Sequence, residues 1–132
     1  QFGYSILIDA HSMPHEAILN ASSSFRTSQI VLGDRFGATC SPEIINDLIM
    51  LVANNGLRAS RNIPFSGAYI VQKYGRPGFN RHAIQLEIDR SLYMDERKIQ
   101  KLEKFHKLKD KLFNILRTFS RSHACATSIA AE

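Results

Sequence analysis

Hydrophobic residues alternate with polar ones in two longer segments of the chain. Residues 82–89 (HAIQLEID) follow a period of two, which is typical of a strand. Residues 4–10 (YSILIDA) are apolar on both faces, as expected for an inner strand of a parallel or mixed sheet rather than an edge strand. Residues 29–32 and 57–60 have the character of shorter strands. The pattern therefore predicts a central sheet.

Two other segments have helical periodicity. Residues 42–55 follow Ser41, a good N-cap, and end before Gly56, a common helix stop. Residues 97–120 carry apolar side chains at helical spacing with lysines between them, which predicts a long closing amphipathic helix. Residues 66–74 suit either a short helix or a strand. The expected fold class is α/β, a mixed central sheet flanked by helices, in a single domain over residues 1–132.

Composition excludes some classes of protein. The 132 residues are 44% hydrophobic, as in a soluble globular protein, and no apolar run reaches the roughly 20 residues of a membrane span. The N-terminus also lacks the layout of a signal peptide, so we expect a cytoplasmic protein with no membrane partner. Cys40 and Cys125 have no CxxC spacing and are expected to be free thiols.

The positive charge is confined to the end of the chain. The net charge is +5, with residues 1–95 neutral and the excess of Lys and Arg in residues 96–132. The simplest interpretation is a solvated helix face, because no aromatic or glycine-rich nucleic-acid reader accompanies the lysines. We therefore expect no nucleic-acid partner.

Several polar residues lie where α/β folds commonly carry their catalytic and ligand-binding residues. Pro14 ends the first predicted strand, so His11 lies at the strand's carboxyl end, where open α/β sheets gather their ligands. Asp9 lies on the same face of this strand as His11, and Glu87 lies on a later strand. Each also has a structural explanation: a lone histidine is commonly a hydrogen-bonded loop residue, and Glu87 could pair with Arg90.

Five ordered blocks of sequence give a more specific indication. In order and spacing they resemble the N-formylglutamate amidohydrolase family, and the likeness covers residues 4–96. The blocks are DAHSMP (9–14), VLGDRFG (31–37), NIPFSGAYI (62–70), YGRP (74–77) and HAIQLEIDRSLYMDE (82–96).

The resemblance implies a zinc-dependent hydrolase with a zinc-peptidase-like fold. In the related zinc carboxypeptidases, a His and a Glu from an early HxxE-type element join a later His-Ser in holding one zinc ion. His11, followed by Ser12, is similar to that third ligand, and Glu87 is similar to the general base on a late strand. Asp9 is a candidate to orient His11, although it is equally explained as a hydrogen-bond acceptor at a strand end.

The implied substrate is N-formyl-L-glutamate, an N-acyl amino acid, and the implied products are formate and L-glutamate. Because this substrate is a dicarboxylate, a cationic clamp is needed, and arginine binds carboxylates with a bidentate fork. Arg35 and Arg61 lie in the matching blocks and are the candidates. A structural ion pair with Glu87 or Asp89 is the alternative. Packing of the strand adequately explains His82 and Tyr93, which belong to the same blocks.

The sequence contains no HxxE pair, and His15-Glu16 is too close to His11 to supply the other ligands. Gln1 is not an initiator methionine, so we expect the C-terminal half of a larger catalytic domain, with the remaining ligands upstream. The alternative is a folded but catalytically silent fragment or decayed relative that acts by packing or self-association, since exposed sheet edges favour homo-oligomers.

Overall fold

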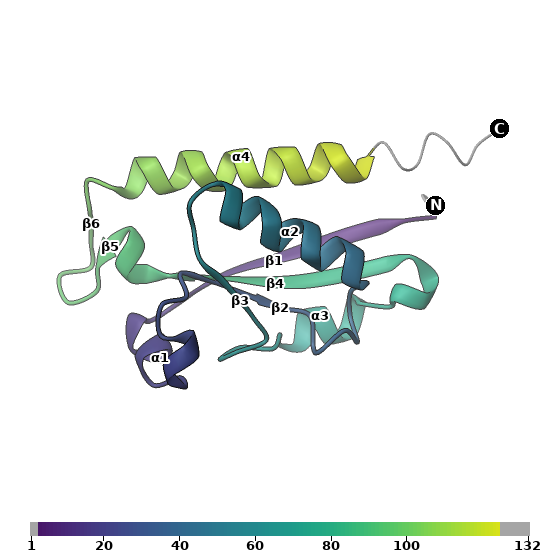
Figure 1. Cartoon of the computed structure of the whole chain (residues 1–132), viewed down its shortest axis with the longest axis horizontal. Helices are drawn as coiled ribbons and strands as arrows, with labels where there is room; N and C mark the ends of the chain where they lie inside the picture. The colour runs from purple at the N-terminus through teal and green to yellow at the C-terminus, as the bar shows by residue number, and fades with distance from the viewer. Residues whose placement is uncertain (1–2, 125–132) are drawn as a thin grey trace.

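The computed structural model describes residues 3–124, which form a sheet with helices on both faces (Figure 1). The strand order is β1-β4-β2-β3, in which β4 pairs parallel with β1 and antiparallel with β2, while β2 and β3 are parallel. The sheet is therefore mixed, and the predicted fold class is confirmed. The strands are β1 (Ser5–Met13), β2 (Ile30–Gly33), β3 (Ala59–Arg61) and β4 (Arg81–Asp89).

The predicted inner position of the first strand stays a prediction, because residues 3–124 form only part of the expected catalytic domain. Within residues 3–124, β1 pairs with β4 alone and lies at the edge of the four-stranded sheet. Ile6 and Ile8 pack against the main core, whereas Leu7 on the other face is 38% exposed. The apolar pattern reports what covers the two faces of a strand; it does not report whether both edges are paired.

One face of the sheet is covered by the helices α2 (Pro42–Asn54) and α4 (Phe105–Ala124). As predicted, α2 has Pro42 in its first turn and Ser41 at the N-cap, although the Ser41 side chain makes no capping bond. The buried side chains between these helices and the sheet make the main core. They include Ile44, Ile45, Leu48 and Val52 of α2, Leu108, Ile115 and Phe119 of α4, and Ile30, Leu32, Ile84 and Leu86 of the sheet.

The long closing helix begins later than the predicted position 97. A hairpin of β5 (Met94–Asp95) and β6 (Gln100–Lys101) precedes it, and the helix extends to Ala124 rather than ending at 120. The Asp95 carboxylate accepts hydrogen bonds from the backbone N–H groups of Arg97 and Lys98. These local bonds satisfy the backbone in a turn, so helical spacing alone placed the start about two helical turns too early.

The opposite face carries α1 (His15–Leu19) and α3 (Tyr69–Tyr74), so the ambiguous segment 66–74 contains a short helix. A second, smaller core of Met13, Ile18 and Val31 lies under α1. No helix within residues 3–124 is long and apolar enough to cross a membrane. Three single 3-10 turns complete the fold: η1 (Ser23–Phe25), η2 (Pro77–Phe79) and η3 (Arg90–Leu92).

Candidate active site on the β1–β4 ladder

His11 and Glu87 are direct register partners in the parallel ladder of β1 and β4. Register partners on adjacent strands point to the same face of a sheet, and adjacent strands lie about 4.8 Å apart. The His11 side chain is 49% exposed, whereas Glu87 is buried at 7%. The structure therefore brings one imidazole and one carboxylate together at the carboxyl ends of two neighbouring strands.

Asp9 holds the His11 ring from the same strand face. The Nε2 atom of His11 lies 2.9 Å from Oδ1 of Asp9, so Nε2 donates this hydrogen bond and Nδ1 is the ring nitrogen left for a cation. The second carboxylate oxygen of Asp9, Oδ2, is buried and has no hydrogen-bond partner within residues 3–124. Asp9 thus has the contact expected of a residue that orients His11.

Glu87 is held by a short chain of hydrogen bonds that begins at the backbone. The N–H of Ala68 donates to Oε1 of Gln85 at 2.6 Å, which fixes the orientation of the Gln85 amide. The Nε2 of Gln85 in turn donates to Oε1 of Glu87, also at 2.6 Å. Both side chains are buried, so one oxygen of Glu87 is fixed and the other remains for chemistry.

The loop of residues 66–68, which contains Ala68, also positions Arg35. The Nη1 of Arg35 donates to the Gly67 carbonyl at 3.1 Å, and the N–H of Arg35 donates to the Ser66 carbonyl at 2.7 Å. Because the next residue, Ala68, binds Gln85, the guanidinium of Arg35 and the carboxylate of Glu87 are anchored to one three-residue segment. Within residues 3–124, Arg35 has no carboxylate partner.

This loop passes unusually close to β2. A Cβ atom added to Gly33 would lie 2.6 Å from the backbone nitrogen of Gly67, a distance that side chains do not tolerate. Gly67 itself has a φ of +108°, in the region that favours glycine. Two glycines of the matching sequence blocks therefore allow the loop to reach Gln85.

Unlike Arg35, Arg61 forms an ion pair with a carboxylate. Its Nη2 and Nε lie 2.6 and 3.1 Å from the two oxygens of Asp34, whose side chain is fully buried. The Asn62 amide also donates to Asp34, at 2.7 Å. This bidentate hydrogen bonding with Asp34 raises the pKa of Arg61 against the opposing effect of burial. The alternative of a structural ion pair thus holds for Arg61, but its partner is Asp34 and not Glu87 or Asp89.

His15 is turned away from a ligand role, as its spacing indicated. Its Nδ1 lies 2.8 Å from Oδ2 of Asp89, which also accepts from the Ser91 hydroxyl at 3.0 Å. No group of three or more His, Cys, Asp or Glu side chains suited to a metal ion occurs within the described residues 3–124. The described residues therefore do not contain a complete set of three metal ligands around His11.

Sequence reasoning missed Gln85 as the residue that positions Glu87, and Asp34 as the anchor of Arg61. A signal for Gln85 was present, because it precedes Glu87 by two positions and thus shares its strand face. No comparable signal identified Asp34, since its contact with Arg61 joins the ends of two different strands. Cys40 is a buried free thiol, as expected, and Cys125 lies outside the described residues.

Comparisons with known proteins match the chain in sequence and in fold. A sequence model described as N-formylglutamate amidohydrolase matches residues 1–94. The N-formylglutamate deformylases of Pseudomonas aeruginosa and Pseudomonas putida are each 36% identical to the chain over 101 residues. The crystal structure of N-formylglutamate amidohydrolase from Ralstonia eutropha JMP134 superposes with a TM-score of 0.82 at 33% identity.

These matches cover most of this chain but a smaller part of the relatives. The two deformylases align with 73% of this chain, which spans 36% of their length. The Ralstonia structure matches 91% of this chain and 44% of its own. Sequence and structure agree over the strands that carry His11 and Glu87, and the chain belongs to the N-formylglutamate amidohydrolase family.

Proposed function

We propose that this protein takes part in the zinc-dependent hydrolysis of the formyl amide of N-formyl-L-glutamate to formate and L-glutamate. The observation that carries the proposal is the pairing of His11 with Glu87 on adjacent strands. Two relatives that are 36% identical are named N-formylglutamate deformylase, which supports this substrate.

In this proposal Glu87 is the general base. Amide hydrolysis needs a group that takes a proton from the attacking water and returns it to the departing nitrogen. The hydrogen bond from Gln85 occupies Oε1 of Glu87, so Oε2 is the oxygen that carries the proton. Burial of Glu87 keeps bulk water away from this transfer.

His11 is the residue of this chain that would hold the zinc ion, through Nδ1. The donor chemistry fits, because the contact from Asp9 to Nε2 orients the ring and fixes its tautomer. Catalytic zinc commonly takes three protein ligands, so the other two donors come from outside residues 3–124. When bound, the ion supplies Lewis-acid chemistry and lowers the pKa of a coordinated water towards about 7.

Arg35 is the stronger candidate to bind a substrate carboxylate. It has no carboxylate partner among residues 3–124, and it shares its loop with the residue that holds Gln85. Arg61 is committed to Asp34 through two nitrogens, although its side chain is still 33% exposed. We therefore assign direct carboxylate binding to Arg35 first, with Arg61 as a second contact through its remaining nitrogen.

The test compares two matched substitutions in the catalytically active protein. Glu87→Gln should remove nearly all release of formate from N-formyl-L-glutamate while the zinc content per chain is unchanged, because Glu87 is proposed to move protons and not to hold the metal. Glu16→Gln, at an exposed glutamate, should leave turnover unchanged. Normal turnover by the Glu87→Gln protein would reject the assignment of the base.

The alternative is that this chain is catalytically silent and acts by packing or self-association. Two observations favour this alternative. The described residues contain no group of three candidate metal ligands, and the chain spans 36% of the length of its named relatives. Zinc analysis of the native protein that contains this chain, with the donors from outside residues 3–124 included, separates the two functions. About one tightly held ion per chain with formate release supports the hydrolase, and neither supports the silent protein.

A further inference from the structure

Three neighbouring strands bring His11, Glu87 and Val31 to one level of the sheet. Glu87 is the register partner of His11 on β1 and of Val31 on β2. Register partners on adjacent strands point to the same face, so Val31 flanks the proposed base on the side opposite to His11. The His11 side chain is 49% exposed, whereas Val31 is fully buried. The proposed reaction centre is therefore bounded on one side by apolar packing.

Met13, Ile18 and Val31 form this boundary, which we call the apolar wall. Met13 follows His11 by two residues and shares its strand face, about 7 Å farther along β1. The strands of Met13 and Val31 are separated by β4, so Ile18 of α1, which packs with them, lies across β4. Met13 is 1% exposed and the other two are 0% exposed, with Phe65 packed against them. The described residues alone bury this wall.

Two carboxylates hold α1 in place over β4. The Nδ1 of His15, the first residue of α1, lies 2.8 Å from Oδ2 of Asp89, which is buried. The backbone N–H of His15 donates to Oε2 of Glu96 at 3.2 Å. The backbone N–H and the hydroxyl of Ser91 donate to Asp89 at 2.9 and 3.0 Å. The helix that carries Ile18 is thus tied at its start to the end of β4 and to the turn after β5.

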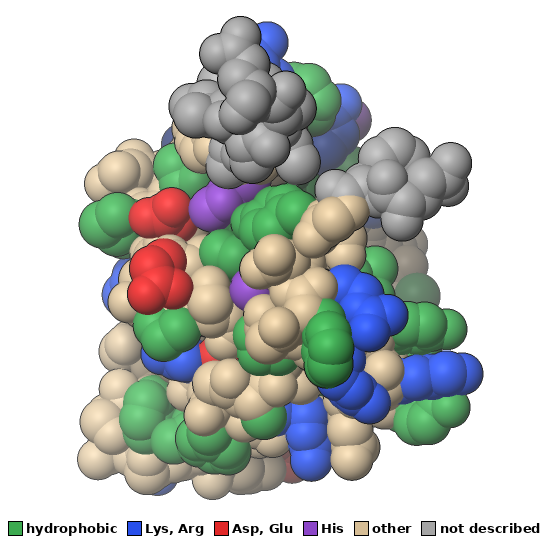
Figure 2. All heavy atoms as spheres, turned by 90° about the vertical axis from the view of Figure 1, so that its right-hand side faces the viewer, with side chains coloured by type: hydrophobic (Ala, Val, Ile, Leu, Met, Phe, Trp, Pro, Cys, Tyr) green, Lys and Arg blue, Asp and Glu red, His purple; other side chains and the backbone are tan. Residues whose placement is uncertain are grey.

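The charged groups indicate how the substrate lies across this centre. Arg35 follows the antiparallel strand β2 and therefore lies towards the amino end of β4. Arg76 and Arg81 lie at the same end, and Figure 2, which faces it, shows Lys and Arg side chains gathered on one side of the surface. The carboxyl end of β4 has the carboxylates of Asp89 and Glu96 instead. A dicarboxylate is attracted to the first end and repelled by the second.

We propose that the apolar wall restricts the acyl group of the substrate to formyl, with Ile18 as the specificity-determining residue. This inference rests on the proposed hydrolase function and adds to it the acyl class that reacts. When the glutamyl part extends towards Arg35, the other substituent of the scissile carbonyl points towards the wall. A formyl group has only a hydrogen atom there, whereas the methyl group of an acetyl substrate needs space that Ile18 fills. Packed side chains resist an added methyl group because they must move to admit it.

The first experiment compares N-formyl-L-glutamate with N-acetyl-L-glutamate as substrates of the catalytically active protein. The wild-type kcat/KM should be at least about 100-fold higher for the formyl substrate. Ile18→Ala should lower this ratio about tenfold, and Ile18→Val should lower it less, because less space is opened. Both substrates are measured on one preparation, so the ratio does not depend on the fraction of the protein that folds.

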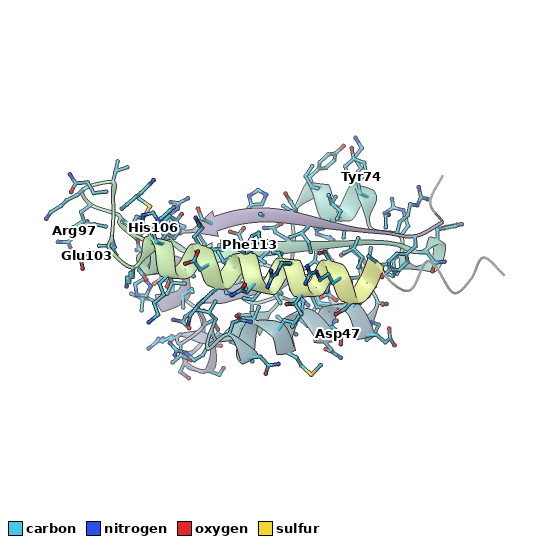
Figure 3. All side chains as sticks on the ribbon, turned by 90° about the horizontal axis from the view of Figure 1, so that it is seen from above. Asp47, Tyr74, Arg97, Glu103, His106 and Phe113 are labelled. Carbon is cyan, nitrogen blue, oxygen red and sulfur yellow. The ribbon has the colours of Figure 1, made fainter. Side chains whose placement is uncertain are left out.

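The matched control lies in the main core, on the opposite face of the sheet. Figure 3, seen from the side of α2 and α4, shows Asp47 of α2 and Phe113 of α4 on that face. Ile45 of α2 is also 0% exposed, and Ile45→Ala and Ile45→Val should leave the ratio unchanged. An equal fall of the ratio in the Ile45 and Ile18 variants would mean that general loosening of the fold admits the acetyl group, and the proposal would be wrong.

The second experiment tests the anchor of α1. His15→Ala removes the contact with Asp89, so amide hydrogen exchange in residues 17–20 should become faster. The formyl-to-acetyl ratio should fall about threefold, while kcat/KM for the formyl substrate stays within about twofold of wild type. His106→Ala, at an exposed position of α4, should change neither quantity. Faster exchange with an unchanged ratio would show that α1 does not set the acyl preference.

The outcomes separate this inference from the proposed function. Absence of formate release by the wild-type protein would reject the hydrolase function, and the inference with it. Normal formate release together with similar turnover of the acetyl substrate would leave the function in place and overturn the role of the apolar wall. A strong formyl preference that Ile18→Ala does not reduce would overturn it as well.

Discussion

The Nε2 of Gln85 donates a 2.6 Å hydrogen bond to Oε1 of Glu87, and both side chains are buried on the same face of β4. The donor is identified without ambiguity, because the other end of the Gln85 amide accepts the backbone N–H of Ala68. Gln85 is thus a positioning residue: it holds one oxygen of the proposed base and leaves the other to face the reaction.

Replacing Gln85 by methionine, which has a similar size but cannot make either hydrogen bond, tests this role. In the active protein, Gln85→Met should lower kcat by roughly tenfold with little change in KM, because the base loses its alignment while the substrate contacts remain. Gln72→Met, on the exposed surface of α3, should leave both constants unchanged. An increase in KM with normal kcat would instead place Gln85 among the substrate contacts.

Removing Arg61 while the buried carboxylate of Asp34 remains should destabilise the protein strongly. Arg61→Met leaves the fully buried Asp34 carboxylate without its cation, and we expect a loss of about 3 kcal/mol in the free energy of unfolding. Urea denaturation measures this loss. Arg26→Met, at an exposed arginine with no carboxylate partner in residues 3–124, should cost little. The double variant Asp34→Leu, Arg61→Met should recover part of the stability if the lone buried charge is the cause.

The sequence predicted the helices and strands of this fold better than it predicted which elements lie next to them. Side-chain periodicity identified β4 and α2 almost to the residue, because β4 is buried along most of its length and α2 buries one apolar face. It failed at the start of α4, where the Asp95 carboxylate accepts hydrogen bonds from the backbone of a turn. It also does not report which edges of a strand are paired, because a period of two is the same in an edge strand and an inner one.

Predicting the candidate site from sequence requires knowing which strands are neighbours, and no single segment of the chain contains that information. Alternation places His11 and Glu87 on one face of their own strands, but it does not state that β1 and β4 are neighbours or which residues stand opposite. The resemblance of the ordered sequence blocks assigned both residues to one site, and the strand register shows that they share one face. Asp34 was not identified as the partner of Arg61 for the same reason, since it comes close only when β2 and β3 align.

The approach of the 66–68 loop to β2 gives a prediction at Gly33. Gly33→Ala would place a Cβ atom 2.6 Å from backbone atoms of Ser66 and Gly67, so the loop must move. We expect a loss of about 1–3 kcal/mol in unfolding free energy, and a loss of formate release because Ala68 no longer holds Gln85. Gly78→Ala, where an added Cβ meets open space, should preserve stability and turnover.

Cys40 should be chemically inert in the folded protein. Burial, assisted by the negative charge of Asp34, raises the pKa of the Cys40 thiol to about 12, and the thiolate is the reactive form. With Cys125 replaced by serine, we expect the native protein to react with a disulfide reagent at pH 8 about 1000-fold more slowly than the same protein in urea. Rapid native labelling would mean that the loop around Cys40 opens readily.

His82 should make the stability of the protein depend on pH. Burial lowers its pKa below the ordinary value of 6.5, and the charge of His123 acts in the same direction while that of Glu43 opposes it. The Nδ1 of His82 accepts the backbone N–H of Ser41, and a protonated ring could not accept this bond. The unfolded chain therefore takes up the proton more readily than the folded chain.

The sign of the effect follows from this difference in proton uptake. Full stability is expected above about pH 6.5, with a loss as the pH falls through 6.5 towards the lower pKa of the folded state. Urea midpoints measured between pH 5 and 8 should fall less steeply for His82→Gln, whose side-chain oxygen can still accept from Ser41. His106→Gln, at an exposed position of α4, should keep the wild-type slope. Equal slopes for all three proteins would exclude His82 as the titrating group.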